Sequence, residues 1–231
     1  MPLLTTNEKQ GCKMNHQKRS LAWVWWTAAE GLTRTVTKLL QKAMGLAESS
    51  SAAYVLATAI IGVVQLITGA VGSAVLKKSL TENKKYIIGS CVFGFVAFWI
   101  IVLTFMVFDL GGDMGVNTFI TTLSIIPGGI IGSYFFGDKL RPQQWFAMAL
   151  AIGAGYLVIG SPSLQEVPHL PSWIGLSFIT MILMGINQGI VQYLKDINPM
   201  VQNFWVGLSQ TALCIAALAL IGGFSVFTYS A

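Results

Sequence analysis

Three ionisable side chains stand four residues apart in the stretch WVWWTAAEGLTRTVTK, residues 23–38: Glu30, Arg34 and Lys38. Residues four apart lie on one face of an α-helix, so the carboxylate and the two cations would form a narrow charged stripe. Such a stripe can bind a proton or a charged solute, or it can be an ion pair that holds helices together. The residues by themselves leave both roles open.

A second set of polar side chains is uncharged and lies in residues 183–194, LMGINQGIVQYL. Asn187, Gln188 and Gln192 can hydrogen-bond a solute, and they can equally serve as contacts between helices. Together with the charged stripe, they form the predicted set of substrate or coupling-ion ligands. Four further polar residues in apolar surroundings are weaker candidates: Gln65, Asn117, Thr121 and Gln210.

Glycine and proline mark the places where helices break or pack closely. Pro127 and Gly128 interrupt the apolar run SIIPGGIIG and predict a helix break, because proline has no N–H to donate. Interrupted helices line binding sites in several transporter folds, but the break can also be a plain kink. The motifs GGIIG, ending at Gly132, and GINQG, residues 185–189, predict close helix packing.

The elements that carry these residues are predicted to be membrane-spanning helices. Of the 231 residues, 54% are hydrophobic and 10% are charged, against about 25% charged in a soluble domain. Runs of about 20 apolar residues are typical of membrane spans. Six such runs are clear, and a seventh, at 21–44, contains the charged stripe. The six are 54–76, 86–108, 116–136, 145–160, 173–194 and 204–227.

The distribution of basic residues favours a spanning helix at 21–44. If it crosses the membrane, one side receives eleven of the 14 lysines and arginines, and the other side receives none. Because basic residues gather on the cytoplasmic side, this distribution predicts a cytoplasmic N-terminus. The eleven are Lys9, Lys13, Lys18, Arg19, Lys77, Lys78, Lys84, Lys85, Lys139, Arg141 and Lys195. An amphipathic helix lying on the membrane surface is the alternative for 21–44.

A weak internal repeat relates the two polar sets. Aligning residues 29–44 with 183–200 places Arg34 on Gln188 and Lys38 on Gln192. The two copies are five helices apart, so the second is inverted, as in many transporters. The predicted organisation is a cytoplasmic tail at 1–20, a five-helix repeat at 21–161 and a partial two-helix repeat at 172–231.

Residues 124–160 resemble EamA-type members of the drug/metabolite transporter superfamily. The resemblance lies in the central Pro127, in the turn Gly-Asp-Lys-Leu at 137–140, and in the glycine-rich helix that follows. It implies a transporter of ten helices in two five-helix repeats, of which this chain would hold about seven. Asp138 stands where the family more usually has glutamate.

The first helix resembles that of the small multidrug resistance exporters, which have an alanine, a membrane-embedded glutamate and a lysine eight positions later. Ala29, Glu30 and Lys38 match this pattern. The resemblance implies that Glu30 exchanges protons for substrate. Arg34 departs from the pattern, because a cation one turn away favours the ionised carboxylate and thus a fixed ion pair.

The sequence therefore predicts an all-α secondary transporter that moves a small molecule across the plasma (inner) membrane by alternating access. The alternative is a truncated or partner-dependent subunit, acting in a homo- or hetero-oligomer without transport of its own. A third possibility is a membrane scaffold. No phosphate loop or nucleophile–base set is recognisable, so we expect no enzymatic activity. We also expect no cofactor, no metal and no nucleic-acid partner.

The orientation of the first span is testable by cysteine labelling. In a variant without the native cysteines, Ser50→Cys and Ser163→Cys should react with an impermeant maleimide added outside, because both loops are predicted to be extracytoplasmic. Ser79→Cys should react only after permeabilisation and serves as the inside control. Labelling of Ser50→Cys only after permeabilisation would contradict a spanning helix at 21–44.

Overall fold

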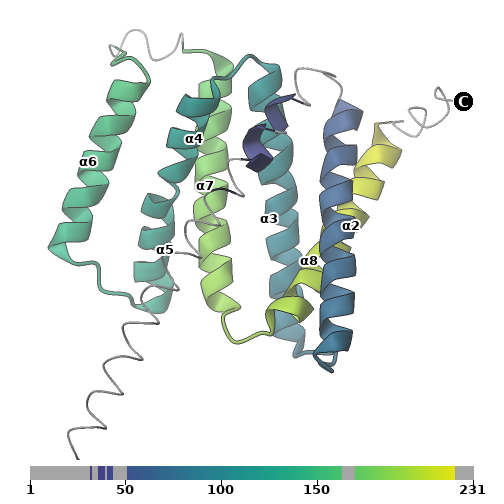
Figure 1. The fold of residues 1–231 in the computed structure, drawn as a ribbon. Helices are drawn as coiled ribbons and strands as arrows, with labels where there is room; N and C mark the ends of the chain where they lie inside the picture. The colour runs from purple at the N-terminus through teal and green to yellow at the C-terminus, as the bar shows by residue number, and fades with distance from the viewer. Residues whose placement is uncertain (1–31, 33–35, 40, 44–50, 163–169, 222–231) are drawn as a thin grey trace, which may run out of the picture. The chain divides into compact units, whose positions relative to one another are not determined.

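The computed structural model describes residues 32, 36–39, 41–43, 51–162 and 170–221 (Figure 1). The chain divides into two compact units, Met1–Ala43 and Met44–Ala231. The described residues of the first unit are helical. In the second unit the described regular elements are all α-helices, which confirms the all-α prediction for this part of the chain.

Seven helices make up the described part of the second unit. They are α2 (Ser51–Val75), α3 (Lys84–Asp109), α4 (Met114–Thr122), α5 (Ile125–Phe136), α6 (Pro142–Val158), α7 (Ser172–Tyr193) and α8 (Pro199–Leu220). Consecutive helical passes run in opposite directions between the two ends of the unit (Figure 1).

Five of the helical segments are long and apolar enough to cross a membrane, which supports an integral membrane protein. They are Ala52–Val75, Lys84–Asp109, Met114–Phe136, Ser172–Tyr193 and Pro199–Leu220. With 22 to 26 residues each, they are about 33–39 Å long, enough for a hydrocarbon core of about 30 Å. Exposed apolar residues follow α2 at helical spacing, as expected of a face turned to lipid: Ile60, Val64, Ile67 and Val71.

The prediction of seven spans needs two qualifications. Helix α6, predicted as a span at 145–160, has only 17 residues and is not among the five, although it returns the chain to the opposite end (Figure 1). The predicted span at 21–44 lies largely outside the described residues, so it and the five-helix repeat remain predictions.

Helix α8 begins at Pro199, five residues before the start expected from apolar character. The side-chain oxygen of Asn198 accepts a hydrogen bond from the Met200 N–H at 2.9 Å and caps the helix. Proline is favoured at the first helical position, where its missing N–H is not needed. Asn198 and Pro199 thus start a helix within residues 195–203, which apolar character alone predicts to be a connection.

The helix break predicted at Pro127 and Gly128 lies slightly earlier, at Leu123 and Ser124 between α4 and α5. Pro127 cannot donate to the Leu123 carbonyl four residues back. That carbonyl instead accepts from the Ile126 N–H at 2.9 Å, and the Ser124 N–H donates to the Thr121 carbonyl at 3.1 Å. These three-residue spacings are those of a 3₁₀ turn, and Pro127 itself lies in the first turn of α5.

Glycines allow the helices of the second unit to approach closely. A Cβ on Gly207 of α8 would overlap the backbone nitrogen of Leu66, and one on Gly69 of α2 would overlap that of Phe204. Helix α3 packs against both α7 and α8, and α7 also packs against α4 and α5. Small residues serve this purpose in membranes, where helices associate through close backbone contact.

Substituting glycine at these contacts should lower stability. Gly207→Ala should lower the free energy of unfolding by about 1–3 kcal/mol, because the new methyl group overlaps the α2 backbone. The thermal unfolding midpoint in mild detergent measures this loss.

Gly175→Ala is the matched control, because no atom lies within 4 Å of a Cβ built there. It should leave the midpoint unchanged or raise it, since alanine favours the helix by about 1 kcal/mol. Equal midpoints for the two variants would contradict close packing of α2 and α8.

Candidate functional site

The 3₁₀ turn between α4 and α5 is where a predicted ligand side chain meets another helix. The Gln188 Nε2 of α7 donates a hydrogen bond to the Ser124 Oγ at 3.2 Å. Gly128 makes room for this amide, because a Cβ there would overlap the Gln188 Oε1. Gly185, one turn earlier in α7, lies against the ring of Pro127. The predicted break and one predicted glutamine are therefore brought together.

Gln192, one turn further along α7, is hydrogen-bonded to the connection between α5 and α6. Its Nε2 donates to the Asp138 Oδ2 at 2.9 Å. Gly137 ends α5 in the left-handed conformation, with φ of 72°, and reverses the chain at Asp138. Sequence reasoning placed Asp138 in a family motif but did not connect it with Gln192.

The two glycine motifs form the surface on which these contacts lie. A Cβ on Gly189 of α7 would lie 2.6 Å from the Ile131 Cγ2 of α5, and one on Gly132 would lie 3.3 Å from the Asp138 Oδ2. The predicted close packing at both motifs is confirmed. Glycine at this interface leaves space for the two glutamine side chains.

Asn117 of α4 is a fully buried polar side chain near this interface. It is 0% exposed, and neither its Oδ1 nor its Nδ2 has a hydrogen-bond partner. Asn117, Thr121 and Ser124 follow one another at helical spacing on one side of the chain, and α4 packs against α7. An unpaired buried amide costs several kcal/mol, so a partner for it is expected. The sequence NTFITTLS, residues 117–124, already shows this helical spacing of polar residues, which indicates a polar helix face.

Asn187 is not part of the same contact. It shares a helix face with Ile190 and Leu194, which pack with Tyr86 and Phe93 of α3. Its Oδ1 is buried without a partner. Adjacent residues on a helix point about 100° apart, so Asn187 and Gln188 serve different interfaces.

The charged stripe of the first unit is described only in part. Lys38 is helical and half-buried. Glu30 and Arg34 lie outside the described residues. The assignment of this stripe to the same ligand set as Gln188 and Gln192 remains a prediction.

A second buried polar group lies between α2 and α8. Gln210 is 0% exposed, and its Nε2 donates to the Thr58 carbonyl at 3.3 Å, while its Oε1 has no partner. The Gln65 Oε1 and the Thr211 Oγ1 are also buried without partners. A Cβ on Gly62 would lie 2.8 Å from the Thr211 Oγ1, so here too a glycine adjoins the polar side chains.

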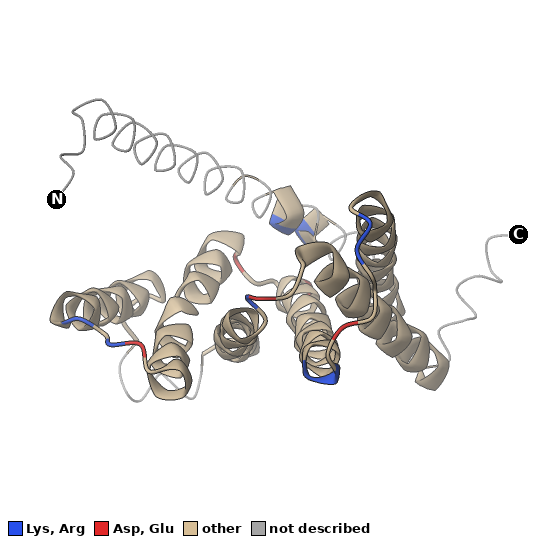
Figure 2. Cartoon of the chain, turned by 90° about the horizontal axis from the view of Figure 1, so that it is seen from below, with Lys and Arg blue, Asp and Glu red and all other residues tan. Residues whose placement is uncertain are grey.

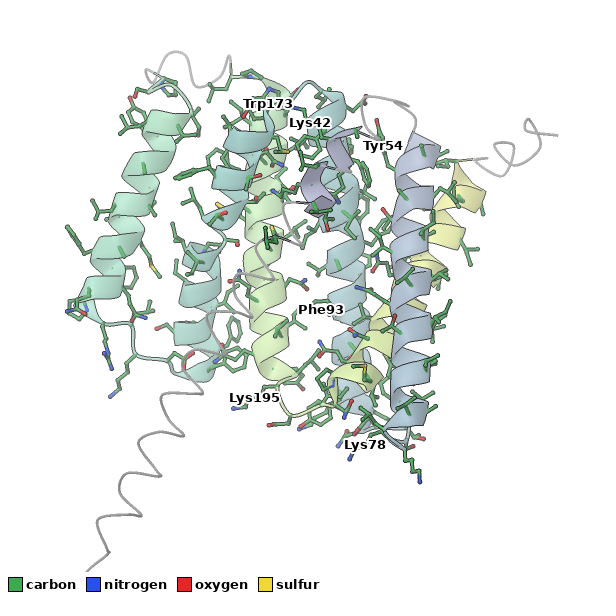
Figure 3. All side chains as sticks on the ribbon, in the orientation of Figure 1. Lys42, Tyr54, Lys78, Phe93, Trp173 and Lys195 are labelled. Atoms are coloured by element: carbon green, nitrogen blue, oxygen red, sulfur yellow. The ribbon has the colours of Figure 1, made fainter. Side chains whose placement is uncertain are left out.

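Charge is confined to the ends of the second unit. Among its described residues, every lysine and arginine lies at one end, where Figure 3 labels Lys78 and Lys195, whereas Asp109 and Asp113 lie at the other. Figure 2 looks onto the basic end and shows charged residues at helix termini and connections. In the part of the chain that the structure describes, no group of histidine, cysteine, aspartate or glutamate could hold a metal ion.

The site that results is a set of amides and hydroxyls in the middle of a membrane-length helix bundle. Its amides and hydroxyls are uncharged hydrogen-bond donors and acceptors. Comparisons of the chain with protein-family models, with curated proteins and with solved structures find no match.

The unpaired Gln210 Oε1 leads to a prediction about stability. Gln210→Met keeps the side-chain volume, removes the unpaired Oε1 and also removes the 3.3 Å hydrogen bond to the Thr58 carbonyl. Because a buried unsatisfied oxygen costs more than one neutral hydrogen bond contributes, the free energy of unfolding should rise by about 1 kcal/mol. The thermal midpoint in mild detergent should increase accordingly. Gln202→Met, at a half-buried position of the same helix, should change it little. A marked loss of stability for Gln210→Met alone would show that the oxygen is satisfied in the folded protein.

Proposed function

We propose that this chain is a secondary transporter of the drug/metabolite type, which moves a small polar molecule across the membrane by alternating access. The observation that carries the proposal is the interruption of a membrane-length helix at Leu123 and Ser124, with the Gln188 amide hydrogen-bonded into it. Non-helical backbone at membrane depth is tolerated where it is buried in protein or lines a cavity. Binding sites in several transporters are built from such interrupted helices.

The chemistry of the site supports a solute that both donates and accepts hydrogen bonds. Asn117, Thr121, Ser124 and Gln188 are uncharged, and Asn117 has an unused donor and an unused acceptor. Glu30 is proposed to bind a proton or a cationic group of the solute. Arg34 would then set its charge or bind an anionic group of the solute.

We propose that the 3₁₀ turn at Leu123 and Ser124 is the hinge of the transport cycle. A 3₁₀ segment within a helix often marks a functional hinge. The hydrogen bond between Gln192 and Asp138 joins α7 to the α5–α6 connection at the basic end. We propose that this end is cytoplasmic and that the bond breaks when the site opens to that side.

A partner-dependent membrane subunit is the second candidate function. It is favoured by α6, in which Gly155 is the buried residue and large side chains such as Trp145 and Phe146 are exposed. In this case another chain would cover α6, and transport would require that chain.

Transport through the site is testable in proteoliposomes. Uptake of a panel of labelled neutral and cationic polar solutes should reveal at least one substrate. Gln188→Leu should reduce its uptake roughly two- to tenfold, the value of one neutral hydrogen bond. Ser124→Ala should have a similar effect, and the double variant should lose no more than either single variant, because both act through one contact.

Gln143→Leu provides the control, because Gln143 is exposed at the start of α6. Wild-type uptake by Gln188→Leu would contradict the proposed site. Uptake only after addition of a membrane extract would favour the partner-dependent subunit.

A further inference from the structure

The connection between α2 and α3 has a defined structure. The Trp205 Nε1 of α8 donates to the Leu80 carbonyl at 3.0 Å and joins the loop to the bundle. Within the loop, the Ser79 and Thr81 hydroxyls are 2.9 Å apart, and the Asn83 side chain caps α3 by accepting from the Lys85 N–H at 3.2 Å. The loop therefore presents its side chains from a fixed backbone.

Four exposed lysines flank this connection: Lys77, Lys78, Lys84 and Lys85. We call residues 77–85, which contain these lysines, the lysine loop. Glu82 is its one acidic residue, and in the described part of the chain no ion pair neutralises these lysines. The first turn of α3 holds two of them and no acid, although the positive end of a helix dipole disfavours cations. The loop thus has four basic residues to one acidic, whereas residues 137–141 have two to one and residues 194–198 have one to one.

The lysine loop lies at the level of the lipid headgroups if its flanking helices span the membrane. It joins the ends of Ala52–Val75 and Lys84–Asp109. The Lys85 Nζ lies 4.5 Å from the centre of the Tyr86 ring, and tyrosine and tryptophan are typical of the membrane interface. Val75 and Leu76, just before the lysines, are 74% and 52% exposed and apolar.

We propose that the lysine loop binds the phosphate headgroup of an anionic phospholipid. The lysines give a loop of fixed backbone a net positive charge, since they outnumber Glu82 by four to one, and the adjoining exposed apolar residues contact the acyl chains. A free phosphate ion would satisfy the charge but not this apolar surface, so a lipid is the better match. Clusters of four or more basic residues next to a span are typical of anionic-lipid binding. The inference rests on the membrane helices and is independent of transport.

Native mass spectrometry of the detergent-purified chain tests the proposal. Phosphatidylglycerol should form adducts at lower concentration than phosphatidylcholine. In a variant with Lys78, Lys84 and Lys85 changed to Gln, the apparent affinity for phosphatidylglycerol should fall roughly a hundredfold. Lys77 is kept because its backbone is left-handed, with φ of 50°, and replacing it could alter the turn.

The matched control changes Lys139, Arg141 and Lys195 to Gln, which removes the same number of exposed charges from the same end of the bundle. It should retain most of the affinity. An equal loss in both variants, at unchanged thermal midpoints, would overturn the proposal in favour of diffuse charge attraction. Equal adducts with phosphatidylcholine would also overturn it. Displacement of phosphatidylglycerol by equimolar inorganic phosphate would reassign the loop as a free-anion site.

Discussion

One carbonyl group, that of Leu123, constrains the centre of this structure. In a lipid bilayer each backbone polar group needs a partner within the protein, and the residue that would normally serve Leu123 is Pro127. The backbone forms a 3₁₀ turn here, in which the Ile126 N–H donates to the Leu123 carbonyl instead. This turn presents Ser124 to α7 and allows Gln188 to hydrogen-bond at membrane depth.

Glycine has the same role at both polar interfaces. Gly128 leaves the space that the Gln188 amide occupies, and Gly62 lies beside the side chains of Gln210 and Thr211. In each case the glycine lets two helices pack closely enough to exclude lipid. Because it has no side chain, it also leaves a small volume for a polar group. The α5–α7 and α2–α8 contacts thus combine tight packing with buried polarity, which in a membrane is costly unless the polar groups find partners.

Much of the helical framework could be predicted, and its errors have identifiable causes. Apolar runs predicted the five segments that are long enough to span, but α6, predicted at 145–160, is a 17-residue helix bounded by Pro142 and the Gly160 turn and is not among them. The apolar run at 204–227 also did not include the first five residues of α8, because that helix starts with a polar cap and a proline. The break near Pro127 was foreseen, but its position was not, because proline disrupts the bond of the residue four places earlier.

The sequence by itself determined that the chain forms apolar helices and that the described basic residues of the second unit gather at one of its ends. Both follow from local physics, since lipid enforces internal backbone hydrogen bonding and short connections alternate the direction of the helices. Only the tertiary structure decided which polar residues meet. Gln188 and Ser124 are 64 residues apart, and Gln192 and Asp138 are 54 apart. Their meeting, and the separate place of Asn187, depend on how each helix is rotated about its axis, which is set by glycine contacts between helices distant in the chain.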